Sequence, residues 1–388
     1  MERSRLLIFV AATICCAMTY ADDWSALGRH QQTISRPGFD ALLARVYCPS
    51  GALTNYLAYG TNSVTVFSTP EKTNALFTLR FSSSASSPGK GPPSIKRVAL
   101  DPGHIGGEWA RMEERFFQRG KDRPVQEAVL NLTAARLLKA RLEARGVEVL
   151  LTKNSFDPVT DKRPADFQAQ AEQDIPLTKF AALPPLDRDA DRADAVRKRA
   201  EQLFYRGSEI AARARLINEQ IKPDLTICMH FNAVEWDECQ SLVDDDRLVV
   251  FVHGDYLAAE LKDDDQKLRL FSKLLEGSHA TEQTVAESIA AAMAVATKLP
   301  PVEYGPSSGA IRLGDSPYVF ARNLAANRLY NGPVVFLEPY YMNNRLVYER
   351  IQLGDYDGTR DVDGVPMKSI FREYADAVAE GLSRFIAR

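Results

Sequence analysis

Apolar residues recur along this chain with two different periods. From residue 96 onward, short continuous apolar runs predict buried strands at residues 96–101, 147–153, 224–232, 247–254 and 332–339. Apolar residues at helical spacing predict helices at residues 126–146, 208–220, 281–299 and 369–388. Strands of this kind, separated by helices, are typical of an α/β fold. We therefore predict an open, mostly parallel twisted sheet with helices on both faces.

A smaller unit precedes this pattern. Residues 36–48 have apolar positions at helical spacing, and residues 56–60, 63–68 and 75–81 form short strand patterns separated by turn residues. Residues 82–95 are rich in Ser, Gly and Pro, a composition typical of a linker. The predicted organisation is a small N-terminal α+β domain at residues 22–81, a linker at 82–95 and a larger domain at 96–388.

The first 21 residues have the pattern of a signal peptide. A short basic start is followed by an apolar run of about 13 residues, which is too short to span a bilayer comfortably, and by small residues ending at Ala21. We expect cleavage near Ala21 and export to the periplasm or cell envelope. No later segment has transmembrane length, so we expect no membrane span in the mature chain.

Charge and cysteine content narrow the function classes. The chain has 48 Lys and Arg against 51 Asp and Glu, and this balance argues against a nucleic-acid partner. Cleavage near Ala21 would leave Cys48, Cys228 and Cys239, an odd number that allows at most one disulfide. A bond between Cys228 and Cys239 and unpaired buried cysteines both stay open.

Candidate chemistry gathers at the ends of predicted strands, where ligands bind in open α/β sheets. His104 and His230 follow two of these strands, Glu338 lies near the end of a third, and Glu127 opens a helix. Two histidines and a carboxylate can hold a catalytic zinc and leave one position open, and a further carboxylate can act as general base. The spacing has no local metal signature, however, and a histidine near a strand end is more often structural. His253 is an alternative ligand, although a packing or surface role is favoured; His279, before a helix, is expected to be solvated.

Four sequence blocks point to a known family. They are "VALDPGHIGG", a glutamate opening a helix, "DLTICMHFNA" and "GPVVFLEPYYMNN", in this order between Arg97 and about Asn344. Together they resemble the zinc-dependent N-acetylmuramoyl-L-alanine amidases of the Amidase_3 family. The resemblance implies that His104, Glu127 and His230 bind Zn²⁺ and that Glu338 is the catalytic base. It also implies a peptidoglycan (muropeptide) substrate, cut between the N-acetylmuramoyl lactyl group and L-alanine, and it allows an activator protein as a partner.

The sequence departs from the family pattern at three places. Ile105 replaces the first glycine after the histidine, Pro339 stands where a glycine is usual, and residues 108–126 are longer and more charged than the usual connection. These differences affect the expected shape of the cleft more than the metal site. Two alternatives stay open: a zinc peptidase that cuts another bond of the stem peptide, and a wall-binding module without turnover.

Two charged segments could regulate such a site. Residues 185–202 mix both signs, which favours a solvated helix with ion pairs one turn apart over a lid across the cleft. Glu235, Asp237 and Glu238 follow His230 closely. By resemblance to family members in which an extra helix places a carboxylate at the open zinc position, these acidic residues suggest an inhibitory element.

Overall fold

The computed structural model describes residues 23–83, 94–180, 185–234, 241–305 and 308–386. The predicted signal peptide, most of the predicted linker, Cys239 and the acidic residues Glu235, Asp237 and Glu238 lie outside the described residues. Cys48 and Cys228 are buried free cysteines. Among the helices described, none combines the length and the apolar character needed to cross a membrane.

The centre of the molecule is a seven-stranded sheet with the strand order β10-β11-β9-β12-β8-β4-β7. In chain order its strands are β4 (Arg97–Pro102), β7 (Glu148–Leu151), β8 (Leu225–Met229), β9 (Leu248–His253), β10 (Ile311–Arg312), β11 (Val319–Arg322) and β12 (Val334–Pro339). Four of the six neighbouring pairs are parallel. This confirms the predicted class, a mostly parallel sheet flanked by helices.

Strand direction decides which residues share an edge of this sheet. β7, β4, β8 and β12 run in the same direction, so their carboxyl ends lie along one edge. β9 instead pairs antiparallel with β12, with Glu338 opposite Val249. His253, at the end of β9, therefore lies at the opposite edge from Glu338.

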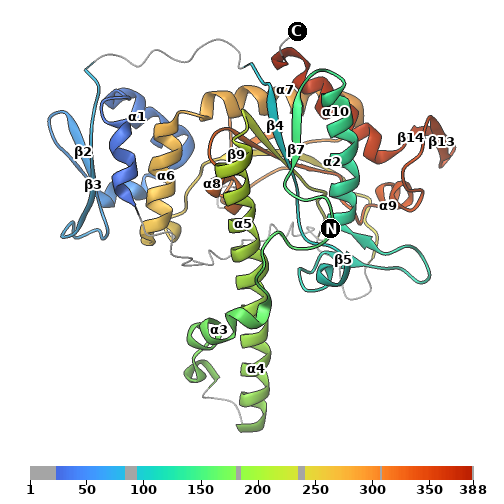
Figure 1. Cartoon of the computed structure of the whole chain (residues 1–388), viewed down its shortest axis with the longest axis horizontal. Helices are drawn as coiled ribbons and strands as arrows, with labels where there is room; N and C mark the ends of the chain where they lie inside the picture. Colours follow the sequence, from blue (N-terminus) through green and yellow to red (C-terminus); the bar gives the residue numbers. More distant parts are fainter. Residues whose placement is uncertain (1–22, 84–93, 181–184, 235–240, 306–307, 387–388) are drawn as a thin grey trace.

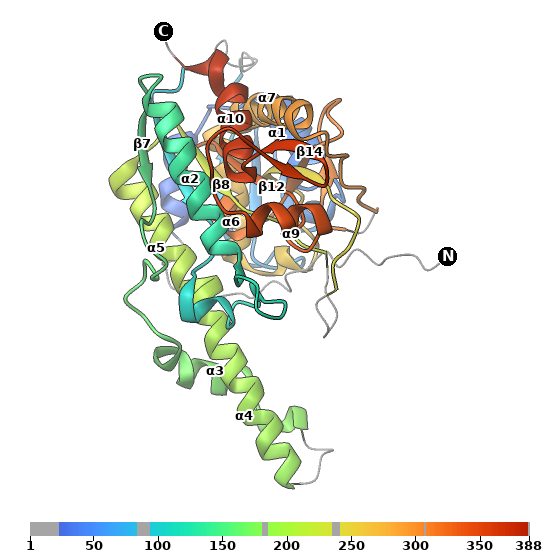
Figure 2. The ribbon, with the colours of Figure 1, turned by 90° about the vertical axis from the view of Figure 1, so that its right-hand side faces the viewer.

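Side chains that alternate along the strands build a core on each face of the sheet. Val98, Leu100 and Ile227 point into one core, whereas Ala99 and Cys228 point into the other. The first core is covered by α2 (Glu127–Glu143), α7 (His279–Thr297) and α10 (Ile370–Leu382), and the second by α5 (Glu209–Arg215), the turn η8 (Leu216–Ile221) and α8 (Ala325–Leu329). The two views of the ribbon show these helices around the sheet (Figures 1 and 2).

The N-terminal unit packs directly onto the body. Its elements are η1 (Trp24–His30), α1 (Arg36–Leu42), η2 (Leu43–Tyr47), η3 (Ala52–Tyr56) and an antiparallel sheet of β1 (Leu57–Tyr59), β2 (Ser63–Phe67) and β3 (Ala75–Arg80). In Figure 1 it lies beside α6 (Asp264–Glu276). The ring of Phe271 on α6 contacts Trp24 and Phe39, with centroids 6.0 and 5.7 Å apart. The buried side chains of the unit belong to one continuous core with α7 and α10.

This packing corrects one expectation. His279, expected to be solvated, is buried at the start of α7, and its ring centroid lies 6.4 Å from that of Tyr47. The N-terminal unit covers it, which the local sequence does not reveal. The domain boundary at residues 82–95 stays a prediction.

A helical arm projects downward from the body in Figure 1. α4 (Pro185–Gln202) continues through η7 (Leu203–Ser208) into α5, and α3 (Gln168–Asp174) packs beside it. Figures 1 and 2 show both α3 and α4 pointing away from the sheet. Arg197 pairs with Asp194 and Glu201 one turn away on either side. This matches the solvated, ion-paired helix favoured by the sequence.

Shorter elements complete the described chain. They are η4 (Gly107–Ala110), β5 (Phe116–Phe117), β6 (Val125–Gln126), η5 (Pro164–Phe167), η6 (Leu177–Phe180), η9 (Glu260–Lys262), α9 (Arg345–Gln352), the hairpin of β13 (Thr359–Val362) and β14 (Val365–Lys368), and η10 (Ser383–Phe385).

Candidate active site

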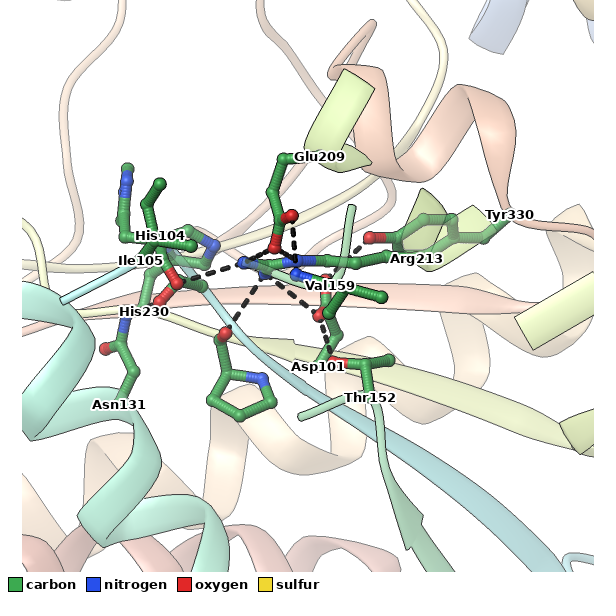
Figure 3. A network of polar contacts seen from close by, with 12 residues as sticks. Asp101, His104, Ile105, Asn131, Thr152, Val159, Glu209, Arg213, His230 and Tyr330 are labelled. Atoms are coloured by element: carbon green, nitrogen blue, oxygen red, sulfur yellow. Dashed lines mark hydrogen bonds and ion pairs between the residues drawn. The ribbon is translucent and has the colours of Figure 1, made fainter. Parts of the chain in front are cut away.

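His104 lies one residue beyond Gly103, in the turn that ends β4. Its backbone has φ = 64°, in the left-handed region, which costs a non-glycine residue on the order of 1–3 kcal/mol unless its surroundings hold it. Arg213 of α5 stabilises this backbone conformation. Its guanidinium donates to the carbonyl oxygens of Pro102 (3.1 Å) and His104 (3.0 Å), on both sides of Gly103 (Figure 3).

Arg213 is in turn fixed by two buried carboxylates. It donates to Asp101 (3.1 Å) and to Glu209 (2.8 Å), and Asp101 also accepts hydrogen bonds from Thr152 (2.6 Å) and Tyr330 (2.7 Å). Burial alone would raise the pKa of Asp101, but the charge of Arg213 and these two hydroxyl groups hold it below its ordinary value. Asp101 is therefore an ionised support for the turn.

His230 directly follows β8, the neighbour of β4. Pro102 and Met229 are partners in the β4–β8 register, so the two strand ends bring both histidines to the same place. Gly103 lies against the His230 ring so closely that an added Cβ would fall 2.0 Å from Cε1. The ring also stacks on Phe336 of β12, with centroids 4.3 Å apart. Glycine is required at position 103 because no side chain fits between the strand ends.

Glu127 is the first residue of α2 and points toward both histidines. Its Oε1 lies 2.8 Å from His230 Nδ1, and its Oε2 lies 3.1 Å from His104 Nε2. One ligand atom from each of His104, Glu127 and His230 lies within 4.8 Å of the others. In the part of the chain that the structure describes, this is the one such cluster of histidine, cysteine and carboxylate side chains.

These residues fit a tetrahedral metal. Two imidazole nitrogens and one carboxylate oxygen converge from a strand end, a neighbouring strand end and a helix start, which is the donor set of catalytic zinc sites. The electrostatics agree with a cation site. Although burial lowers the pKa of a histidine, the carboxylates of Glu127 and Glu113 raise the pKa of His104 to about 9.

Glu338 lies near the end of β12 and lines the same cleft as the three residues. Burial, and then the negative charge of Glu127, raises the pKa of Glu338 to about 8. The charges of His104 and Arg115 act in the opposite direction. The structure thus brings all four predicted site residues to one cleft.

The cleft has a volume of about 580 Å³ and contains residues to which the sequence analysis gave no role. Among them are Glu113, Arg115, Tyr205, Arg206, Asn232, Tyr304, Arg322 and Tyr341. Glu113 and Arg115 come from the long, charged segment at residues 108–126, so its departure from the family length was the available signal. Arg213 lies on the helix predicted at residues 208–220, outside the quoted family blocks.

His253, the alternative ligand, does not join the cluster. It is fully buried at the opposite edge of the sheet, where its ring lies 3.0 Å from the hydroxyl group of Tyr256. It therefore has the packing role that was favoured.

Comparisons with known proteins identify the family of this chain. The family model described as N-acetylmuramoyl-L-alanine amidase, Amidase_3, matches residues 98–360. No curated protein sequence matches the chain.

Solved amidase structures also match, at low identity. The amidase Ami1 from Mycobacterium smegmatis is 15% identical, with 76% of this chain and 98% of that chain covered and a TM-score of 0.40. Ami1 from Mycobacterium abscessus is also 15% identical, with 76% of this chain and 100% of that chain covered and a TM-score of 0.40. The CwlD amidase from Clostridioides difficile, solved in complex with the GerS lipoprotein, is 14% identical. The match covers 75% of this chain and 98% of that chain, with a TM-score of 0.39. Since the family model spans more than half of the sequence, the chain belongs to the Amidase_3 family of N-acetylmuramoyl-L-alanine amidases, which hydrolyse an amide bond of peptidoglycan.

Proposed function

We propose that this protein is a zinc amidase that cleaves the bond between the N-acetylmuramoyl lactyl group and L-alanine. His104, Glu127 and His230 would hold the metal, and Glu338 would be the catalytic base. The observation that carries the proposal is the convergence of three ligand atoms within 4.8 Å, in a cleft that also contains a buried carboxylate.

The chain's own residues perform the proton transfers. His104, Glu127 and His230 would hold a zinc ion, whose chemistry when bound would be to lower the pKa of water and to polarise the scissile carbonyl group. Glu338 accepts a proton from the attacking water and then donates it to the alanine nitrogen as the C–N bond breaks. The products are a free lactyl carboxyl group and a free amine. Burial and Glu127 raise the pKa of Glu338 to about 8, and a cation held by the three ligands would favour its ionised form, which would let it act as a base at neutral pH.

The rest of the cleft suits a sugar–peptide substrate. Asn232 and Tyr304 offer hydrogen-bonding groups, and Arg322 offers a positive charge. Peptidoglycan lies outside the cytoplasm, and we propose that residues 1–21 direct export to the periplasm or cell envelope. The activator protein stays a prediction.

Digestion of purified sacculi tests the reaction. The protein should release fragments with a free lactyl carboxyl group by mass analysis, and a chelator should abolish the release until zinc is restored. A shortened stem peptide would instead indicate the zinc peptidase. Binding without release of any fragment would indicate the wall-binding module.

Glu338→Ala tests the mechanism. The variant should bind zinc at the level of the wild type but lose turnover, because the proton acceptor is gone while the three ligands remain. Glu380→Ala, an exposed glutamate on α10, is the matched control and should keep full activity. Full activity of Glu338→Ala would refute the role of Glu338.

A further inference from the structure

The segment between His104 and α2 reaches back over the metal site. It contains η4 and the short hairpin of β5 and β6, and Phe116 pairs with Gln126 in that hairpin. The ring of Trp109 packs against Phe204 of η7, with centroids 5.3 Å apart. Phe117 also stacks on Tyr348 of α9, with centroids 5.8 Å apart, so the segment is anchored to the body at two places and can position side chains in the cleft.

Glu113 is the buried carboxylate of this segment, and only 3% of its side chain is exposed. One oxygen, Oε2, accepts a hydrogen bond from the backbone N–H of Ile105 at 3.0 Å and lies 3.1 Å from His104 Nδ1. A buried carboxylate needs such donors, because burial without them is costly. The backbone N–H fixes the carboxylate, and the carboxylate then fixes the imidazole ring.

The contact leaves Nε2 as the nitrogen of His104 that can bind a metal. The Glu113 carboxylate can only accept, so Nδ1 keeps its proton and donates it to Glu113, whereas a proton on Nε2 beside Glu127 would leave when a metal binds. Nε2, which lies 3.1 Å from Glu127 Oε2, then faces the metal position. Hydrogen bonds of this kind orient metal-binding histidines and strengthen their binding.

The same segment contacts a second ligand. Arg115, two residues after Glu113, lies with its Nε 3.1 Å from Glu127 Oε2, and its carbonyl oxygen accepts from the Glu127 backbone N–H at 3.3 Å. Residues 108–126 therefore contact two of the three predicted metal ligands. Glu113 contacts His104, and Arg115 contacts Glu127.

We propose that Glu113 is a positioning residue of the metal site, which holds His104 with Nδ1 protonated and Nε2 directed at the metal. The inference rests on the proposed function for the identity of the ligands. It assigns a role to the long, charged connection by which this chain departs from its family.

The decisive comparison is between Glu113→Ala, Glu113→Gln and Glu108→Gln. Alanine removes the acceptor, glutamine keeps an acceptor oxygen without the charge, and Glu108 is an exposed glutamate of the same segment. Zinc affinity, measured by competition with a chromophoric chelator, should fall about 10- to 100-fold in Glu113→Ala. It should fall less in Glu113→Gln and stay unchanged in Glu108→Gln.

A second readout needs neither metal nor substrate. In ¹⁵N-histidine-labelled, metal-free protein, the His104 Nδ1–H should give a downfield resonance protected from exchange with water, assigned by its loss in His104→Gln. The resonance should persist in Glu108→Gln and disappear in Glu113→Ala. Thermal unfolding of each variant reports whether it folds, and Glu113→Gln serves in place of the alanine variant if that variant does not.

The outcomes separate the two proposals. Wild-type zinc affinity in Glu113→Ala, or an Nδ1–H resonance that persists in it, would overturn the positioning role. If the wild type itself binds no zinc, the proposed function fails, whereas loss of the protected resonance in Glu113→Ala would still support the orientation of His104 by Glu113.

Discussion

Gly103→Ala should disable the metal site while leaving the protein folded. The added Cβ would lie 2.0, 2.2 and 2.5 Å from three atoms of the His230 ring, against about 3.4 Å for ordinary contact. The ring or the turn must therefore move by about 1.4 Å. The ring is already held by Phe336 and by the 2.8 Å contact with Glu127, so a shift of this size breaks at least one of these contacts.

The expected effects follow from that shift. A misplacement of about 1 Å in a catalytic site can cost about 100-fold in rate, so turnover should fall by at least that factor. Zinc affinity should also fall by about 100-fold, because Zn–N bonds of about 2.0–2.1 Å do not tolerate the displacement. The cost in unfolding free energy should be that of overpacking, about 1–3 kcal/mol, which leaves the chain folded.

Chelator competition, sacculus digestion and chemical denaturation measure the three quantities. Gly28→Ala is the matched control, because its added Cβ would meet nothing within 4 Å. Zinc affinity of Gly103→Ala within twofold of the wild type would refute the geometry described for the strand ends.

Two further changes test the supports of the site by chemical denaturation of metal-free protein. Arg213→Met leaves Asp101 and Glu209 buried without their cation and should lower the unfolding free energy by about 3–5 kcal/mol. Arg215→Met, at an exposed position on the same helix, is the control and should change it little. A decrease below about 1 kcal/mol for Arg213→Met would contradict the role of this network. Burial and then the charge of Arg213 lower the pKa of Lys153 to about 7, so above that pH the unfolded chain binds the extra proton. Lys153 should therefore contribute a rise in unfolding free energy of up to about 1.4 kcal/mol per pH unit between pH 7 and 10, measured as the difference between the wild type and Lys153→Met because the raised pKa values of His104 and Glu338 act in the opposite direction. Lys153→Met should lack this rise, and parallel pH profiles of the two proteins would show that Lys153 does not titrate in this range.

The sheet could be predicted because burial on both faces leaves a continuous apolar run, as in β4, β8 and β12. The direction of β9 could not, because periodicity carries no information about direction. The strand pattern also does not identify β11, which has four residues. α6 is not among the predicted helices, although Leu270, Phe271 and Leu274 have helical spacing and Asp263 caps its first turn.

The four site residues could be predicted from the sequence because of where they lie. His104, Glu127, His230 and Glu338 each lie at or near the end of a regular element within a quoted block. Arg213 and Asp101, by contrast, are 112 residues apart, and their contact depends on how α5 packs against the end of β4. Periodicity places both residues on their elements but does not show that they meet.

Two departures from the family pattern explain each other in the structure. Ile105 replaces a glycine, and its side chain is completely buried, so the substitution adds apolar packing beside a histidine in a left-handed conformation. Its backbone N–H donates to Glu113, which lies in the longer connection to α2. A glycine at position 105 would leave the turn more freedom to move. The isoleucine and the long charged segment therefore act together to hold His104 in place.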